Sequence, residues 1–313
     1  MMILHRHIRL EAASHCQLKC PSCPTAAGII DKAIPRAFLR AADFRDLVEK
    51  HPWIQSVEIS NYGEAFLNPQ LREILEIADR HDVAITIANG ANLNNVRPEV
   101  LEALVKYRVR TITCSIDGAT PETYRVYRVG GDFDTVIGNI RAINAHKKAL
   151  GSELPALTWQ FVVFGHNEHE IPKARAMAEE LGMTFRPKIS WDSKFSPIRN
   201  PEFVRREARQ AATREEHKQD SDEEYTAAIC EQLWHSPQVN SDGKVLGCCL
   251  NFWGDFGGNV FAEGLARGLN HEKMIHARAM LQGRAPARAD IPCTTCSLYH
   301  WRRDKARWVK KTP

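Results

Sequence analysis

The chain has 313 residues, of which 43% are hydrophobic and 26% are charged, a composition typical of a globular protein with a sizeable core. No apolar run approaches membrane-spanning length, and the N-terminal residues lack the apolar region and cleavage site of a signal peptide, so no membrane partner and a cytoplasmic location are expected. The net charge is +4, and residues 299–313 alone carry +5, so the rest of the chain sums to −1. This distribution weighs against a nucleic-acid-binding surface along the whole chain. This end is expected to be a solvated helix, with 306–313 as a basic tail.

The first two-thirds of the chain alternate between strand-like and helix-like segments. Strands are expected at 7–14, 56–60, 84–90, 110–118, 156–164 and 184–191, and helices at 40–50, 69–81, 98–107, 134–150 and 168–181. Asn68 and Asp134 are expected to be helix caps, with Pro69 at a first helical position. Six β–α units in series predict an α/β fold with a parallel sheet. Because six units are too few for the usual eight-stranded barrel, we expect a partial (β/α)6 barrel over residues 1–195.

Strand parity predicts a polar interior for this barrel. In the fourth strand the side chains at 112, 114 and 116 share one face, and those at 113, 115 and 117 share the other. The first two strands alternate in the same way, which places Glu11 and Glu58 on the face opposite their apolar neighbours. Helices that cover the apolar face would bury Cys114 and leave charge and hydroxyls in the lumen, where an ordinary barrel holds branched apolar side chains. A bound polar ligand is therefore expected in the lumen.

Directly after the first strand, the segment "CQLKCPSC" places Cys16, Cys20 and Cys23 within eight residues. The chain has nine cysteines, an odd number in bunches, without an export signal, which indicates metal binding rather than a disulfide framework. A C-x3-C-x2-C loop can reach three corner irons of a cubane and leave the fourth iron open for a small chelating ligand. A zinc site, which normally closes with four ligands, and chance clustering are the alternatives.

This motif resembles the one that defines the radical S-adenosylmethionine (SAM) superfamily. The resemblance implies a [4Fe-4S] cluster on Cys16, Cys20 and Cys23, with SAM chelating the open iron through its amino and carboxylate groups. It further implies that one electron cleaves SAM to a 5′-deoxyadenosyl radical that abstracts hydrogen, so a reductant such as flavodoxin or ferredoxin is expected as a partner. In the family the residue before the third cysteine is usually aromatic and packs against adenine, but here it is Ser22.

Other segments resemble the family's SAM-binding segments. "SNYGEAFLNP" is similar to its Gly-Gly-Glu-Pro segment, so Glu64 is expected to accept from the SAM amino group beside the backbone of Gly63. Tyr62 and Ala65 depart from that pattern. The resemblance implies further SAM contacts near the carboxyl ends of strands, where barrel active sites lie: Asn89 in "IANG", Ser115 and Arg128 in "TITCSIDGATPETYRVYRVGG", and Gln160 on the fifth strand.

The polar stretch "RREARQAATREEHKQDSDEE" separates the barrel from a second group of cysteines. Residues 196–228 are therefore expected to form a polar linker or helix, and 229–305 a small cysteine-rich unit. In this unit "VNSDGKVLGCC" predicts a β-hairpin with its turn at Asp242-Gly243.

The second group comprises Cys230, Cys248, Cys249, Cys293 and Cys296. Adjacent strand residues point in opposite directions, so only one of Cys248 and Cys249 is expected to be a ligand, and taking Cys248 gives a closed site of four. The gaps of 18, 45 and 3 residues resemble the "twitch" domain, a shortened relative of the SPASM domain, as in the 2-deoxy-scyllo-inosamine dehydrogenase type. This resemblance implies an auxiliary [4Fe-4S] cluster, and a four-thiolate zinc site is the alternative.

A closed second cluster indicates electron transfer, since all of its irons are ligated by the protein. The leading hypothesis is a radical SAM oxidoreductase that oxidises an alcohol on a polar metabolite such as an aminocyclitol or sugar, with the auxiliary cluster accepting an electron. Glu11 and Glu58 are expected to bind hydroxyl or ammonium groups, and Tyr62 to lie at the pocket. Arg186 or Lys188 on the sixth strand is the candidate proton acceptor.

Three alternatives stay open. A maturase forming thioether or carbon–carbon links in a ribosomally made peptide often carries a leader-recognition domain, and no spare segment is expected before the first strand. An epimerase would need a hydrogen-donating thiol, for which Cys249 is the candidate. A non-catalytic zinc-binding interaction module would leave the segments around Glu64 and Ser115 without a purpose.

Overall fold

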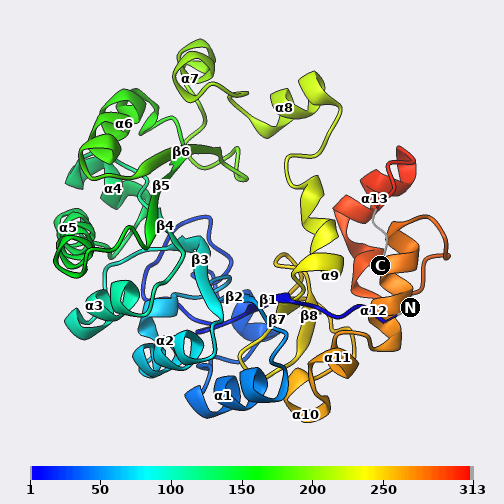
Figure 1. Ribbon diagram of the computed structural model, residues 1–313. Helices are drawn as coiled ribbons and strands as arrows, with labels where there is room; N and C mark the ends of the chain where they lie inside the picture. Colours follow the sequence, from blue (N-terminus) through cyan, green and yellow to red (C-terminus); the bar gives the residue numbers. More distant parts are fainter. Residues whose placement is uncertain (1, 311–313) are drawn as a thin grey trace.

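The computed structural model of the protein describes residues 2–310 and is built around one eight-stranded sheet (Figure 1). The strand order is β6-β5-β4-β3-β2-β1-β7-β8, and β1 to β6 run parallel to one another. This arrangement confirms the predicted α/β fold with a partial six-stranded barrel. The barrel strands are β1 His7–Leu10, β2 Ser56–Glu58, β3 Ala84–Ala91, β4 Thr111–Ser115, β5 Ala156–Val163 and β6 Thr184–Ile189.

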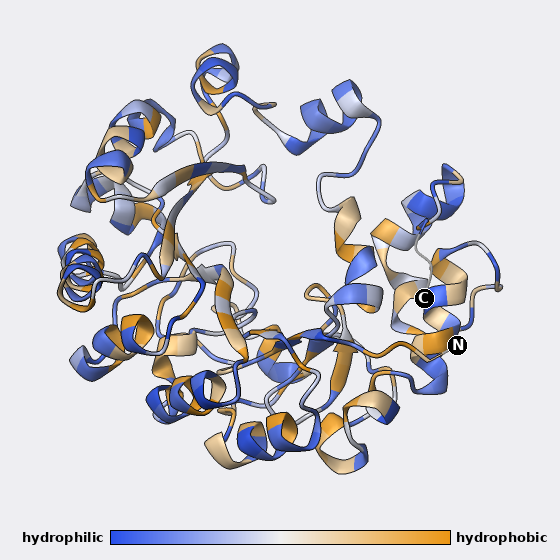
Figure 2. Ribbon diagram, viewed as in Figure 1, coloured by the Kyte–Doolittle hydropathy of each residue, from blue (hydrophilic) through white to orange (hydrophobic). Residues whose placement is uncertain are grey.

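Helices cover the outer face of the barrel strands and turn their apolar sides toward them (Figure 2). In α2, for example, the buried side chains include Leu71, Ile74, Leu75 and Ala78, three or four residues apart along one helix face. The α4 helix follows β4 directly and was not predicted. The barrel helices are α1 Ala41–Lys50, α2 Leu71–Arg80, α3 Pro98–Lys106, α4 Pro121–Tyr127, α5 Phe133–Leu150 and α6 Ile171–Glu180, with 3-10 turns at Ile30–Lys32, Ala65–Leu67 and Glu168–Glu170.

Two predicted helix starts were wrong. Helix α2 begins at Leu71 rather than Pro69. The side-chain oxygen of Asn68 accepts from the N–H of Gln70 at 2.8 Å, which closes a turn before the helix instead of capping its first turn. The Asn68 amide nitrogen donates to the backbone oxygens of Ala12 and Leu39, at 2.8 and 2.9 Å. Helix α5 begins at Phe133, and its cap is Asp132, not Asp134.

The C-terminal unit extends the barrel sheet at its β1 edge. Strand β7 (Gln238–Val239) pairs parallel with β1, and β8 (Val245–Gly247) pairs antiparallel with β7. Gly243 in the predicted hairpin turn has a φ of +85°, a conformation that favours glycine. Sharing one sheet places this cysteine-rich unit beside the loop that follows β1. Its helices are α9 Gln232–His235, α10 Val260–Glu263, α11 Leu265–Gly268, α12 Glu272–Leu281 and α13 Ser297–Asp304, with 3-10 turns at Ala227–Glu231 and Pro292–Thr295.

The polar stretch between β6 and the C-terminal unit forms α7 (Pro201–Ala208) and α8 (Arg214–Ser221), which span the open side of the ring in Figure 1. The predicted solvated terminal helix is only partly right. Helix α13 buries Arg302, whose guanidinium donates to the backbone oxygens of Ala227 and Arg307, each at 2.7 Å. The end of the predicted basic tail, residues 311–313, lies outside the described residues. No helix in the described part of the chain is long and apolar enough to cross a membrane.

Candidate active site

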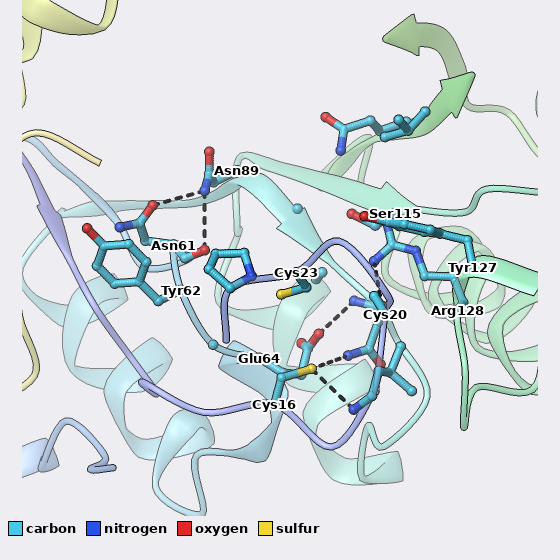
Figure 3. A pocket seen from close by; sticks show the side chains of 18 of the residues that line it. Cys16, Cys20, Cys23, Asn61, Tyr62, Glu64, Asn89, Ser115, Tyr127 and Arg128 are labelled. Atoms are coloured by element: carbon cyan, nitrogen blue, oxygen red, sulfur yellow. Dashed lines mark hydrogen bonds between the residues drawn. The ribbon is translucent and has the colours of Figure 1, made fainter. Parts of the chain in front are cut away.

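A cavity of about 240 Å³ opens at the carboxyl ends of the parallel strands (Figure 3). Its wall combines the cysteine loop after β1 with the segments that follow β2, β3 and β4 and with the ends of β5 and β6. Most of the predicted site residues line it together: Cys16, Cys20, Cys23, Tyr62, Gly63, Glu64, Asn89, Ser115, Arg128, Gln160 and Lys188. The parallel topology brings them to one place, because strands that run in the same direction end at the same edge of the sheet.

The three cysteines of the first loop carry free thiols that face this cavity. Cys16 Sγ accepts from the backbone N–H of Leu18 at 3.4 Å and from the Asn92 side chain at 3.6 Å. Burial raises the pKa of Cys16 to about 12 and also raises the pKa of Cys20. Thiols in such surroundings become thiolates when a cationic centre binds them, and three of them on one loop fit three corners of an iron–sulfur cluster.

The loop after β2 holds the cysteine loop in place through Gly63. A Cβ atom at Gly63 would lie 2.0 Å from the backbone oxygen of Ala13 and 2.5 Å from the nitrogen of His15, so only glycine fits here. The next residue, Glu64, donates its N–H to the His15 oxygen at 2.9 Å. From behind, the Glu11 carboxylate accepts from the N–H groups of Tyr62 and Gly63 at 3.0–3.2 Å. Backbone contacts thus fix the position of the first cysteine.

Glu64 lies at the base of the cavity and is only 3% exposed. One carboxylate oxygen accepts from the N–H of Phe66 at 3.2 Å, and the other accepts from the N–H of Asn92 at 2.7 Å. Burial raises the pKa of Glu64 to about 7, although these N–H groups oppose the rise. A buried carboxylate with accepting capacity left can receive further donors from a bound ammonium group.

Ser115 and Gln160 are paired neighbours on β4 and β5, and both side chains line the cavity. Gly90 lies so close that a Cβ atom there would be 2.5 Å from the Ser115 hydroxyl oxygen, and its φ of +125° also favours glycine. Asn89 projects from the same segment and donates to the Asn61 side chain at 3.0 Å (Figure 3). These groups form a polar rim that suits hydroxyls of a ligand.

Arg128 follows α4 and is bound to a carboxylate of the protein. Its guanidinium donates to Asp117 at 2.6 Å and lies 3.9 Å from the Cys20 sulfur. The Asp117 side chain is completely buried and also accepts from the N–H of Val162. Arg128 therefore places positive charge beside a cysteine, while its predicted contact with SAM stays a prediction.

Two residues of the cavity wall, Asn92 and Trp191, were not predicted from the sequence. Asn92 touches both Cys16 and Glu64, and the only signal for it is its position just after "IANG". Trp191 also lines the cavity and is 56% exposed. Its neighbour Asp192 accepts from the hydroxyl of Ser22 at 2.6 Å, so the tryptophan is anchored to the cysteine loop where the family's aromatic residue is missing.

The two predicted lumen carboxylates do not line the cavity. Glu11 is 1% exposed, and its carboxylate accepts from the backbone N–H groups of the loop after β2. Glu58 accepts from the hydroxyl of Thr86 at 2.6 Å and from the N–H of Ala88 at 2.8 Å, and also from the N–H and hydroxyl of Ser60. Both carboxylates are thus taken up by backbone and hydroxyl donors of the protein.

The second cysteine group surrounds a small cavity in the C-terminal unit. Cys230, Cys248, Cys293 and Cys296 all line it, and the rest of its wall is almost entirely apolar. Cys249 does not line it; its N–H and sulfur interact with the Gln232 side chain at 2.8 and 3.5 Å. The four thiols and their dry surroundings match the donor set and shielding of a closed iron–sulfur site. Nowhere in residues 2–310 do three or more His, Cys, Asp or Glu side chains converge on a position for a single metal ion.

Comparisons with known proteins agree with this architecture. A sequence model described as the Radical SAM superfamily matches residues 10–177. The AdoMet-dependent heme synthase of Methanosarcina barkeri is 26% identical over 179 residues, 56% of this chain and 48% of that protein. The chain thus spans about half the length of the curated relatives it matches.

Two solved structures share the fold across nearly the whole chain. SuiB of Streptococcus suis, bound to S-adenosylmethionine, superposes with a TM-score of 0.65 at 16% identity, covering 94% of this chain and 71% of that one. BtrN in complex with AdoMet and 2-DOIA superposes with a TM-score of 0.54 at 14% identity, covering 95% and 94%. Identities this low show a common fold and leave the reaction open.

Proposed function

Because the chain belongs to the radical SAM superfamily, we propose that it is an oxidoreductase that converts an alcohol carbon of a small polar substrate into a carbonyl. When bound, the first cluster and SAM supply a 5′-deoxyadenosyl radical that removes a hydrogen atom from this carbon. The substrate radical would then have to lose a proton and one electron, and a second cluster held by Cys230, Cys248, Cys293 and Cys296 would accept that electron. Overall, the alcohol and SAM become the carbonyl compound, 5′-deoxyadenosine, methionine and a proton, and the electron spent on SAM is recovered.

In this proposal Cys16, Cys20 and Cys23 hold the first cluster. Glu64 accepts from the SAM amino group, because no other carboxylate among residues 2–310 lines the cavity. Ser115, Gln160 and Asn89 face the carboxylate and ribose of SAM from the polar rim. Trp191 supplies the aromatic surface for adenine that Ser22 cannot provide.

The second cysteine group is the observation that carries the choice of an oxidation. Cys230, Cys248, Cys293 and Cys296 give four protein ligands around one apolar cavity, so a cluster there has no open iron for substrate. Electron transfer is the chemistry left to such a cluster. Its unit is joined to the barrel at β1, directly beside the first cysteine loop.

The test uses anaerobically reconstituted protein. We expect iron and sulfide for two four-iron clusters and 5′-deoxyadenosine after reduction with SAM. Cys230→Ala should still cleave SAM but yield no oxidised product, while Cys114→Ala, a change in the barrel core, should behave like the wild type. Full product formation by Cys230→Ala would remove the electron-acceptor role. Transfer of deuterium from a labelled small polar alcohol to 5′-deoxyadenosine, rather than from a labelled peptide, identifies the substrate class.

An epimerase is the second candidate, and the position of Cys249 favours it. This thiol lies outside the second cysteine cavity, and the backbone oxygen of Cys249 accepts at 3.3 Å from the side chain of Asn61, which lines the active-site cavity. A thiol there can return a hydrogen atom to a substrate radical. Incorporation of solvent deuterium at an inverted carbon, lost in Cys249→Ala, would establish epimerisation in place of oxidation.

A further inference from the structure

A second polar cavity, of about 430 Å³, adjoins the cavity of the first cysteine group. The two share Asn89, Gln160 and Lys188 in their walls. The remaining wall comes from Ala88, Arg186, Pro187, Gln210 and Tyr225. A substrate that reaches the reacting carbon near SAM can therefore extend into this second cavity.

The register of the sheet places two cations there. Gln160 pairs with Ser115 on one side and with Arg186 on the other, so the three form a row across β4, β5 and β6. Lys188 follows Arg186 by two residues and pairs with Val162, which lines the first cavity. Because side chains two residues apart on a strand point to the same face, both cations project into the lumen.

These cations have no carboxylate partner within residues 2–310. Arg186 donates to the neutral amide oxygen of Gln160 at 2.9 Å, and the structure shows no ion pair for Lys188 in the same range. Asp117, whose charge acts on Lys188, is already bound by Arg128. Burial, followed by the positive charges of Arg186 and Arg214, lowers the pKa of Lys188.

A third cation, Arg214 of α8, lies beside the wall of the second cavity. The Arg214 guanidinium lies 5.1 Å from the centre of the Tyr225 ring, which lines the second cavity. Its Nε atom is buried without a hydrogen-bond partner in the described part of the protein. Arg186 is exposed to the solvent of the second cavity, whereas Lys188 and Arg214 are partly buried. A partly buried cation without a counter-ion loses hydration, and a bound anion would offset that loss.

We propose that the second cavity is the subsite for an oxyanion of the substrate, a carboxylate or phosphate group, held by Arg186 and Lys188. The inference rests on the proposed function and narrows its substrate from any polar alcohol to an anionic one. It disfavours an aminocyclitol, whose ammonium group would meet positive charge here while Glu11 and Glu58 are occupied elsewhere. It also replaces the expectation that one of the two cations accepts the proton, because each is engaged with the anion.

Binding of small ions to the reconstituted protein with SAM, without reductant, tests this directly. The probes are inorganic phosphate, acetate and methylammonium, measured by isothermal titration calorimetry. We expect phosphate or acetate to bind, and the tighter of the two identifies the oxyanion. Arg186→Gln and Lys188→Gln should each weaken that binding by about tenfold or more, as expected for hydrogen bonds between charged groups. Lys173→Gln removes the same charge from the exposed side of α6 and should change nothing.

Arg186→Lys keeps the charge and should retain much of the affinity, provided that iron content and circular dichroism show folded protein. Methylammonium binding more tightly than both anions, no anion binding, or equal affinity in Lys188→Gln and Lys173→Gln would each overturn the proposal. These outcomes are separate from the radical SAM chemistry. If 5′-deoxyadenosine forms but no anion binds, only the subsite fails; if an anion binds but no 5′-deoxyadenosine forms, only the proposed reaction fails.

Discussion

The hydroxyl of Tyr62 donates a 2.7 Å hydrogen bond to the backbone oxygen of Asn251, across the junction between the barrel and the C-terminal unit. The Tyr62 ring also meets Phe252 edge-on at 6.5 Å. On the barrel side, the Tyr62 backbone oxygen accepts from the hydroxyl of Thr25, just beyond the first cysteine loop. Tyr62 thus links the segments that carry the two cysteine groups, through its backbone on one side and its side chain on the other.

Tyr62→Phe should loosen this junction without disturbing the first cysteine group. The variant keeps the ring contact but leaves the Asn251 oxygen without its donor, at a cost of about 1–3 kcal/mol. We expect a lower melting temperature and slower product formation, with iron content and SAM cleavage preserved. Tyr107→Phe is the matched control, because the structure shows no hydrogen bond for that hydroxyl among residues 2–310. Equal melting temperatures for the two variants would show that the link is unimportant.

Gly63→Ala should prevent assembly of the first cluster. Its Cβ would lie 2.0 Å from the Ala13 oxygen, so the backbone leading to Cys16 must move. We expect roughly half of the iron to be lost and no 5′-deoxyadenosine to form. In Gly138→Ala, on the exposed side of α5, the added Cβ meets nothing within 4 Å, and helix propensity predicts a gain of about 0.5–1 kcal/mol. Full iron content in Gly63→Ala would contradict the packing argument.

Two adjacent cysteines should differ sharply in their effect on the second cluster. Cys248 lines the cavity of the second group and Cys249 does not, so Cys248→Ala should lose that cluster while Cys249→Ala keeps it. Loss of a ligand typically lowers metal affinity or activity by more than the roughly 10–100-fold seen for its outer-shell partners. Iron and sulfide analysis of both variants decides the matter. The reverse pattern would make Cys249 the ligand.

Glu11 should make the stability of the protein depend on pH. Burial raises its pKa from 4.5 to about 7, against the opposing effect of the Tyr62 and Gly63 N–H groups. With a raised folded-state pKa, the stabilising contribution is complete below pH 4.5 and is lost as the pH rises through 7. Relative to the Glu11→Gln variant, the free energy of unfolding of the wild type should therefore fall by about 3 kcal/mol as the pH rises across this range. Melting temperatures of both proteins at pH 5 and pH 8 measure this change, and a constant difference would refute it.

Trp191→Ala should weaken SAM binding by about tenfold, consistent with a base–aromatic stack worth about 1–3 kcal/mol. SAM should quench the tryptophan fluorescence of the wild type more than that of the variant. Trp191→Phe retains an aromatic face and should restore most of the affinity. If the Trp191→Ala variant binds SAM as tightly as the Trp191→Phe variant does, adenine packs against another part of the protein.

Periodicity and motif spacing predicted most of the fold and most of the residues that the structure brings together around the first cavity, while their roles stay a prediction. All six barrel strands were predicted, because each is a short apolar run between turn signals. In a parallel sheet the residues that follow the strands lie at the same edge, so these residues come together. The helix starts near Asn68 and Asp134 were missed, because the caps depend on which backbone groups a side chain can reach in three dimensions. The pairing of β7 with β1 is a contact between residues more than 200 positions apart, and no local pattern encodes it.

The lumen carboxylates show the limit of strand parity. Parity placed Glu11 and Glu58 on the inner face, but whether a buried carboxylate meets a ligand or the protein's own N–H groups depends on loops that parity does not describe. Asn92 and Trp191 were not predicted for the same reason, because both lie in irregular segments that come close to the cysteines only in the folded chain.

We propose that the loop of Cys16, Cys20 and Cys23 holds a cluster with one iron free for SAM. Electron paramagnetic resonance of the reduced Cys248→Ala variant, with and without SAM, tests it on the first cluster alone. We predict that SAM changes the spectrum of this variant. A spectrum that is identical with and without SAM would contradict the account.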